Sequence, residues 1–114
     1  MNTNDTTRIA GVLLALAVLA ITPLAQAKDT PWTSISSLEI QSEGNLFLDP
    51  TNSVINPANC KNNSAYALGK SHAAFTRIYA LLLNAYRKNS EVKLNISKKQ
   101  CVKSRPKING AAVR

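Results

Sequence analysis

The 114-residue sequence is poor in the residues that most enzyme and metal sites need. It contains two cysteines, one histidine, four glycines and six acidic residues, and aromatic residues make up 5% of it. Two isolated cysteines and one histidine do not provide the closely spaced ligand pairs of a zinc site. The sequence has no Gly-rich phosphate loop and no Gly-x-Ser-x-Gly motif. These shortages argue against an enzyme, and we expect neither a cofactor nor a bound metal.

The longest apolar run of the sequence is also short. It covers residues 9–21, follows a basic residue, and precedes the small residues Ala25 and Ala27. A transmembrane helix needs about 20 apolar residues, whereas small residues at this spacing are typical of signal peptidase sites. We therefore predict a signal peptide over residues 1–27, with an uncleaved anchor helix as the alternative. The mature chain, residues 28–114, is then expected to lack a transmembrane segment and to be exported to the periplasm or the medium.

The mature region is long enough for a single domain with a small core, and such a domain usually needs a stabilising cross-link. Its two cysteines, Cys60 and Cys101, lie 41 positions apart. In an oxidising compartment they are expected to form an intramolecular disulfide. Closing this loop restricts the unfolded chain, which contributes roughly 4 kcal/mol of stability in the loop-entropy model.

Charge is distributed unevenly along the mature chain. Residues 28–59 carry a net charge of −3, whereas residues 60–114 carry +11. A basic half favours anionic partners such as nucleic acid, acidic lipid headgroups or charged glycans. Nucleic acid is disfavoured, because the basic residues are not interleaved with aromatic ones and the chain is predicted to be exported. The alternative is that these lysines and arginines only solvate the surface.

Part of the positive charge is concentrated in two short segments on either side of Cys101. A disulfide at Cys101 would hold the two segments together, and a preorganised cationic rim can bind anionic groups. The residues of this predicted basic rim are Lys98, Lys99, Lys103, Arg105 and Lys107.

One stretch shows a helical period that changes to a strand period. Apolar side chains at spacings of three and four predict an amphipathic helix over about 71–88, which Asn89 can end in the left-handed conformation. The residues of this apolar stripe are Phe75, Ile78, Tyr79, Leu82, Ala85 and Tyr86. Strict alternation over residues 91–97 then predicts a half-buried strand. Leu81 and Leu83 widen the apolar arc of the helix and are candidates for an oligomer face.

The remaining segments predict short strands, turns and one long loop. Strands are expected near residues 36–42, 46–49, 65–68 and 108–113, with an Asn-rich loop over residues 51–64. Together with the helix they indicate an α+β domain. We predict a small curled antiparallel β-sheet, or an oligonucleotide/oligosaccharide-binding (OB)-like barrel, of about five strands with the helix packed on it.

Groups that could act in catalysis are scarce. His72 is the only histidine of the sequence, and no nucleophile or carboxylate accompanies it at a recognisable spacing. We therefore expect a solvated residue near the start of the helix. Glu39, Glu43 and Asp49 lie on or beside the first predicted hairpin, but no two of them form an evident pair of acid and base. A small hydrolase that uses His72 or Glu39 is the least favoured function.

The second half of the sequence resembles a known family in the order of its elements. The matching features are a helix that ends in Ala85-Tyr86, an alternating strand from Glu91, the pair Cys101-Val102, a loop with Pro106 and a closing apolar strand. They resemble the C-terminal half of the pentameric B subunits of AB-type bacterial toxins. This resemblance implies an exported, disulfide-bonded OB-type barrel that assembles into a ring around its helices and binds host glycans.

The sequence departs from the enterotoxin branch of that family at two positions. Cys60 lies in a mid-chain loop, and Lys103 occupies the place of a sugar-stacking tryptophan. No glycan-contacting residue is therefore transferred from the family. We expect an exported, non-catalytic binding module for glycans or another anionic surface ligand, which could form a homo-oligomer. The alternative is a structural or inhibitory partner of an envelope protein.

Overall fold

The structure is a computed structural model that describes residues 27–114. The predicted signal peptide therefore lies outside the described residues, apart from Ala27. Within residues 27–114, no helix is long and apolar enough to cross a membrane.

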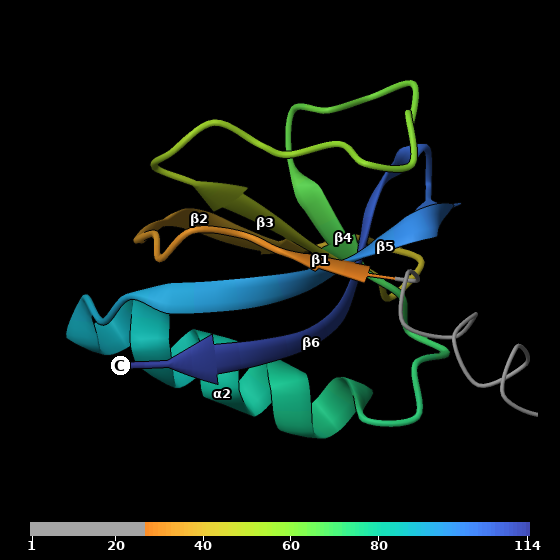
Figure 1. The fold of residues 1–114 in the computed structure, drawn as a ribbon. Coiled ribbons are helices and arrows are strands. Elements are labelled where there is room, and N and C mark those ends of the chain that lie inside the picture. The colour runs from red at the N-terminus through yellow and green to blue at the C-terminus, as the bar shows by residue number, and fades with distance from the viewer. Residues whose placement is uncertain (1–26) are drawn as a thin grey trace, which may run out of the picture.

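The described chain forms one six-stranded sheet and one helix, so the predicted α+β class is confirmed. The elements are β1 (Ala27–Asp29), β2 (Ile35–Ile40), β3 (Leu46–Pro50), β4 (Tyr66–Leu68), α2 (Phe75–Lys88), β5 (Val92–Val102) and β6 (Arg105–Val113). The strand order in the sheet is β1-β5-β6-β4-β3-β2. Figure 1 shows α2 on one side of the sheet and the long loop between β3 and β4 on the opposite side.

Three details of the predicted sheet are corrected by the structure. The sheet has six strands instead of about five, and it is mixed instead of antiparallel because β4 and β6 run parallel, with Ala67 opposite Lys107. The strand order is open, so the sheet is not closed into a barrel. The parallel pair follows from the order of the elements. After β4 the chain crosses over through α2, and the β5–β6 hairpin that follows places β6 beside β4.

The two edge strands of the sheet are consecutive in the chain. The segment between β1 and β2 continues to pair with β5: Thr33 N donates to Val92 O at 2.9 Å and Val92 N donates to Thr33 O at 2.8 Å. Thr30 N also donates to Leu94 O at 2.8 Å, and Leu94 N donates to the Thr30 hydroxyl at 2.9 Å. Beyond Thr33 the chain leaves β5 and pairs with β3 as β2. The chain from β1 to β2 therefore pairs first with β5 and then with β3, near opposite edges of the sheet. The sheet must be strongly curled for one short segment to reach both.

The core lies between α2 and the inner face of the curled sheet. Ile78, Leu82 and Ala85 are the buried residues of α2 and belong to the apolar stripe expected from the sequence, whereas Tyr86 of that stripe is exposed, at 41% relative accessibility. The strands contribute the fully buried side chains Leu46, Leu48, Tyr66, Leu68, Val92, Leu94, Ile96 and Ile108. Burial of one such aliphatic side chain contributes about 1.5–3 kcal/mol. Packing on α2 is therefore a main source of stability for this small domain.

The helix is shorter at its start than predicted and ends as predicted. It begins at Phe75, and the side chain of its N-cap residue, Ala74, makes no capping hydrogen bond. His72 instead accepts the Ala74 N–H at Nδ1 (2.9 Å), and its Nε2 donates to the Asn109 carbonyl on β6 (2.9 Å). The expected solvated histidine is thus a half-buried link between the start of α2 and β6. Asn89 ends the helix in the left-handed conformation, with φ 55°.

Strand β5 extends further than the alternating pattern indicated. The alternating pattern predicted a strand over residues 91–97, but the strand continues to Val102. The register jumps between the Ile96 and Cys101 pairings, so the intervening residues bulge out of the sheet. The Ser97 hydroxyl stabilises this bulge by accepting the N–H groups of Lys99 (3.1 Å) and Gln100 (3.0 Å).

Candidate functional site

The outer face of the β2–β3 hairpin carries polar side chains in a regular pattern. Glu39 lies opposite Phe47, and Ser37 lies opposite Asp49. Because neighbouring residues of a strand point to opposite faces, these four side chains share the face that points away from the core. On the next strand, Ala67 lies opposite Phe47 and adds only a methyl group to that face.

A pocket of about 220 Å³ opens on this outer face. Its walls come from the hairpin, from the end of the long loop and from the start of β6. The lining residues are Ser37, Glu39, Phe47, Asp49, Ser64, Ala65 and Arg105. Large side chains on the hairpin and on β6 flank the small Ala65, which accounts for the hollow between them.

Arg105 is the cation of this pocket, and its guanidinium is held in place. The guanidinium carbon lies 4.0 Å from the centroid of the Phe47 ring, a cation–π arrangement. Nη1 donates to the Lys103 carbonyl at 3.1 Å. Nε is buried and has no hydrogen-bond partner among residues 27–114. A buried donor without a partner costs about 1–3 kcal/mol, which the other contacts of this side chain must offset.

The turn before Arg105 has an unusual backbone. Lys103 and Ser104 both have positive φ, at 48° and 64°. Two-residue hairpin turns of this kind are usually made by Asn-Gly or Gly-Gly, because most side chains disfavour the left-handed region. Neighbouring segments stabilise it: Asn62 N donates to Ser104 O at 2.9 Å, and Lys103 Nζ lies 2.8 Å from a Glu43 carboxylate oxygen. The surrounding contacts therefore fix the turn that carries the arginine.

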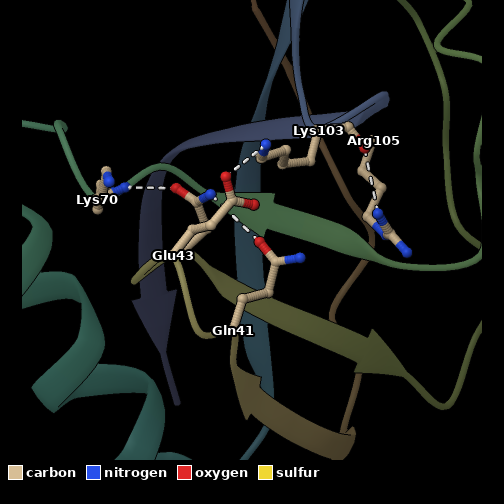
Figure 2. A network of polar contacts seen from close by, with 6 residues as sticks. Gln41, Glu43, Lys70, Lys103 and Arg105 are labelled. Carbon is tan, nitrogen blue, oxygen red and sulfur yellow. Dashed lines mark hydrogen bonds and ion pairs between the residues drawn. The ribbon is translucent and has the colours of Figure 1, made fainter.

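Figure 2 shows that the β2–β3 turn and the segment after β4 lie beside the β5–β6 turn. In the β2–β3 turn, the Asn45 amide donates to Gln41 Oε1 at 3.2 Å and accepts the Lys70 N–H at 2.9 Å. Glu43 of the same turn makes the ion pair with Lys103. The hydrogen bond from Lys103 holds the pKa of Glu43 below its ordinary value, so the carboxylate stays ionised. The β2–β3 turn, the segment after β4 and the β5–β6 turn thus form one polar network.

The long loop that supplies Ser64 is anchored at several points. The predicted disulfide between Cys60 and Cys101 is confirmed, with the two Cα atoms 5.9 Å apart. The Asn56 side chain makes two hydrogen bonds to the backbone of Cys60, both at 2.8 Å. Asn56 Oδ1 accepts the Cys60 N–H, and Asn56 Nδ2 donates to the Cys60 carbonyl. Tyr66, whose pKa is raised by burial, accepts the Ile55 N–H at its hydroxyl at 2.8 Å. The loop therefore holds its end of the pocket against the sheet.

The structure does not bring the predicted basic rim together at this pocket. Arg105 alone of its five residues lines the pocket. Lys103 is paired with Glu43, and Lys107 Nζ donates to Gln100 Oε1 at 2.6 Å. Lys98 and Lys99 are exposed on the bulge of β5.

The other residues of the pocket were not predicted as a site from the sequence. Glu39 and Asp49 were considered only as an unconvincing catalytic pair, and Phe47 only as part of a strand. Period-two alternation along the hairpin would have placed them on one face, because Leu46 and Leu48 must face the core. Nothing local could place Arg105 beside them, since that contact joins residues 58 positions apart.

A second aromatic residue is covered by cations at the other end of β5. Lys93 Nζ lies 5.2 Å and the Arg114 guanidinium carbon 4.6 Å from the centroid of Trp32. Arg114 also pairs with Glu91 at 2.8 Å. With two cations over the ring, this indole is not a free stacking surface for a ligand.

The helix residues proposed as an oligomer face differ in exposure. The Leu81 side chain is exposed, at 39% relative accessibility, whereas Leu83 is half-buried. In the part of the chain that the structure describes, His, Cys, Asp and Glu side chains do not gather in groups of three or more that could hold a metal ion.

Comparison with known proteins gives no relative for this chain. No protein-family model matches it, and neither the curated proteins nor the solved structures contain a match. The interpretation of the pocket therefore depends on its own geometry.

Proposed function

We propose that this protein is a small exported, non-catalytic module that binds glycans in the pocket between the β2–β3 hairpin and Arg105. The observation that carries this proposal is the arginine itself: it lines the pocket, is stacked on Phe47 and is fixed by the Lys103 carbonyl. Preorganised polar groups of this kind give orientation and specificity in small-molecule sites.

The chemistry of the lining suits a polyhydroxylated ligand. Carboxylates, serine hydroxyls and a guanidinium together offer both acceptors and donors within one hollow of about 220 Å³. This volume is below the usual range of drug-sized pockets, roughly 300–1,000 Å³, and suits a single sugar ring or the end of a longer chain. A sugar ring presents hydroxyls that donate and accept hydrogen bonds around its whole edge.

The topology supports the same location. If β1 and β2 count as one bent strand, the chain has five strands, a helix between the third and fourth, and a parallel pairing of the third and fifth. We propose that this open, curled sheet has the topology of an OB-type fold. In such folds, ligands bind on the face of the second and third strands and at the loops 1–2 and 4–5. Here these parts are β3, β4, the β2–β3 turn and the β5–β6 turn.

Export is supported by two features. The N-terminal residues have the composition of a signal peptide, and the Cys60–Cys101 disulfide suits an oxidising compartment. From the resemblance to toxin B subunits, we also propose that the chain is related to that family and that copies of it assemble around α2. Leu81 is the exposed residue on which such an assembly would depend.

Glycan-array screening of the mature protein tests the proposed function, with affinities measured by calorimetry. Replacement of Arg105 by alanine should weaken binding of an array hit at least about tenfold, because it removes the central polar anchor of the site. The control is Lys99→Ala, which removes an exposed cation outside the pocket and should leave affinity unchanged. Equal losses in both variants would point to general charge attraction and contradict the pocket assignment.

Light scattering on the same samples tests the oligomer. Ring formation predicts a mass several times that of the monomer, and a return to monomer in the variant Leu81→Glu. A strictly monomeric wild type would remove the toxin-subunit interpretation without affecting the pocket.

A further inference from the structure

The charge of the pocket is opposite in sign to that of the whole chain. The full sequence carries a formal net charge of +8, whereas the pocket contains two carboxylates, Glu39 and Asp49, and one cation, Arg105. Both carboxylate residues are exposed at the surface. A ligand that entered by general attraction to the basic surface would thus meet a site of net charge −1.

The two carboxylates are not neutralised within the protein. Across the part of the chain that the structure describes, the ion pairs are Glu43 with Lys103 and Glu91 with Arg114, and neither Glu39 nor Asp49 takes part in one. Arg105 is held by the Phe47 ring and the Lys103 carbonyl, and it forms no ion pair with either carboxylate. The pocket therefore has a surplus of hydrogen-bond acceptors, since an ionised carboxylate has about four acceptor sites and no donor.

The strand register sets the spacing of these acceptors. Glu39 faces Phe47 and Asp49 faces Ser37, so the two carboxylate residues form a diagonal pair on one face of the hairpin. Side chains in this relation start about 7 Å apart, which leaves room for one small cationic group to contact both. A primary ammonium has three N–H donors and no acceptor, and it is the group that fits between two carboxylates.

We propose that the ligand of this pocket is an amino sugar with a free, protonated amine, which Glu39 and Asp49 bind between them. This inference rests on the proposed glycan-binding function and specifies its ligand class. The amine neutralises the acidic side of the pocket, while a hydroxyl or ring oxygen of the same sugar accepts from the guanidinium of Arg105. An acidic sugar would bring its charge beside two carboxylates and is selected against.

Two trisaccharides test this assignment by calorimetry: β-1,4-linked glucosamine trimer and its fully N-acetylated form. They share one backbone and differ in whether the amines are charged. In mildly acidic buffer, where the amines are protonated, the free-amine trimer should bind at least about tenfold more tightly. N-Acetylneuraminic acid, as the acidic probe, should bind more weakly than the free-amine trimer.

Three variants that each raise the net charge by one locate the site. Glu39→Gln and Asp49→Asn should each weaken binding of the free-amine trimer at least about tenfold. The matched control is Glu91→Gln, because Glu91 pairs with Arg114 and does not line the pocket. It should leave affinity unchanged. Thermal unfolding of all three confirms that they are folded.

The outcomes separate this inference from the function on which it rests. Equal or tighter binding of the acetylated trimer or the acidic sugar, lost in Arg105→Ala, would overturn the amine assignment and leave glycan binding in place. Failure of every probe and every array glycan to bind would overturn both. An equal loss in Glu91→Gln would show that charge alone, and not the pocket, attracts the free amines.

Discussion

On the side of the sheet that α2 covers, the chain is stabilised by burial of apolar side chains (Figure 1). The long loop on the opposite side packs Val54 and Ile55 against the core, but it is also held by a cross-link and polar contacts. Leu82 on the helix is fully buried, while Cys60 in the loop is fixed by a disulfide and by the amide of Asn56. The pocket lies with the second set, since Ser64 and Arg105 follow the disulfide residues closely in sequence. The two sides can therefore be disturbed separately.

The largest expected effect comes from the helix side. Replacement of Leu82 by alanine leaves a cavity among fully buried side chains and should lower the free energy of unfolding by about 2–5 kcal/mol, as measured by denaturant titration. The same substitution at the exposed Leu81 should cost less than about 1 kcal/mol. Similar losses at both positions would show that α2 does not bury Leu82 in preference to Leu81.

Removal of the disulfide is expected to have the next largest effect. The double variant Cys60→Ser/Cys101→Ser should lose about 2–4 kcal/mol of stability, through greater freedom of the unfolded chain. Hydrogen exchange should show faster exchange in the loop after β3 than in α2, and glycan affinity should fall because Ser64 is no longer held. Unchanged affinity in a folded double variant would mean that the loop does not shape the pocket.

The smallest expected effect concerns the ion pair that joins two turns beside the pocket. The hydrogen bond from Lys103 lowers the pKa of Glu43 from its ordinary value of 4.5, so the folded state binds this proton less readily than the unfolded state. The contribution to stability is therefore present above that value and is lost as the pH falls through the lowered pKa. Because the pair is exposed, salt should weaken it.

Comparison of the melting temperatures of wild type and Glu43→Gln between neutral and acidic pH measures this contribution. The two proteins should differ slightly at neutral pH and converge in acid. A difference that grows towards acidic pH would contradict the stated direction of the shift.

Prediction from the sequence succeeded where a local pattern decides the structure. The stripe containing Ile78 and Leu82 has the period of a helix, Asn89 marks its end, and alternation from Val92 marks the strand that follows. The disulfide also followed, because the sequence has only two cysteines.

Most of the missed features depend on contacts between distant residues. Segment 30–34 pairs with β5, and the parallel partner of Ala67 is on the last strand. The pocket was missed for the same reason, since Phe47 and Arg105 meet only in the folded chain. The extension of β5 is the exception, because the Ser97 hydroxyl that supports its bulge accepts N–H groups only two and three residues further along the chain.

The parallel pairing of β4 and β6 also constrains the order in which the chain can fold. Ala67 finds its partner Lys107 only when nearly the whole chain is present, and the disulfide joins almost the same two segments. The β2–β3 hairpin, by contrast, needs only contacts that are close in sequence. Contacts of high sequence separation form slowly because the intervening loop must close first. The side of the pocket that carries Glu39 and Asp49 can therefore form early, whereas Arg105 joins it only after the β5–β6 hairpin has docked.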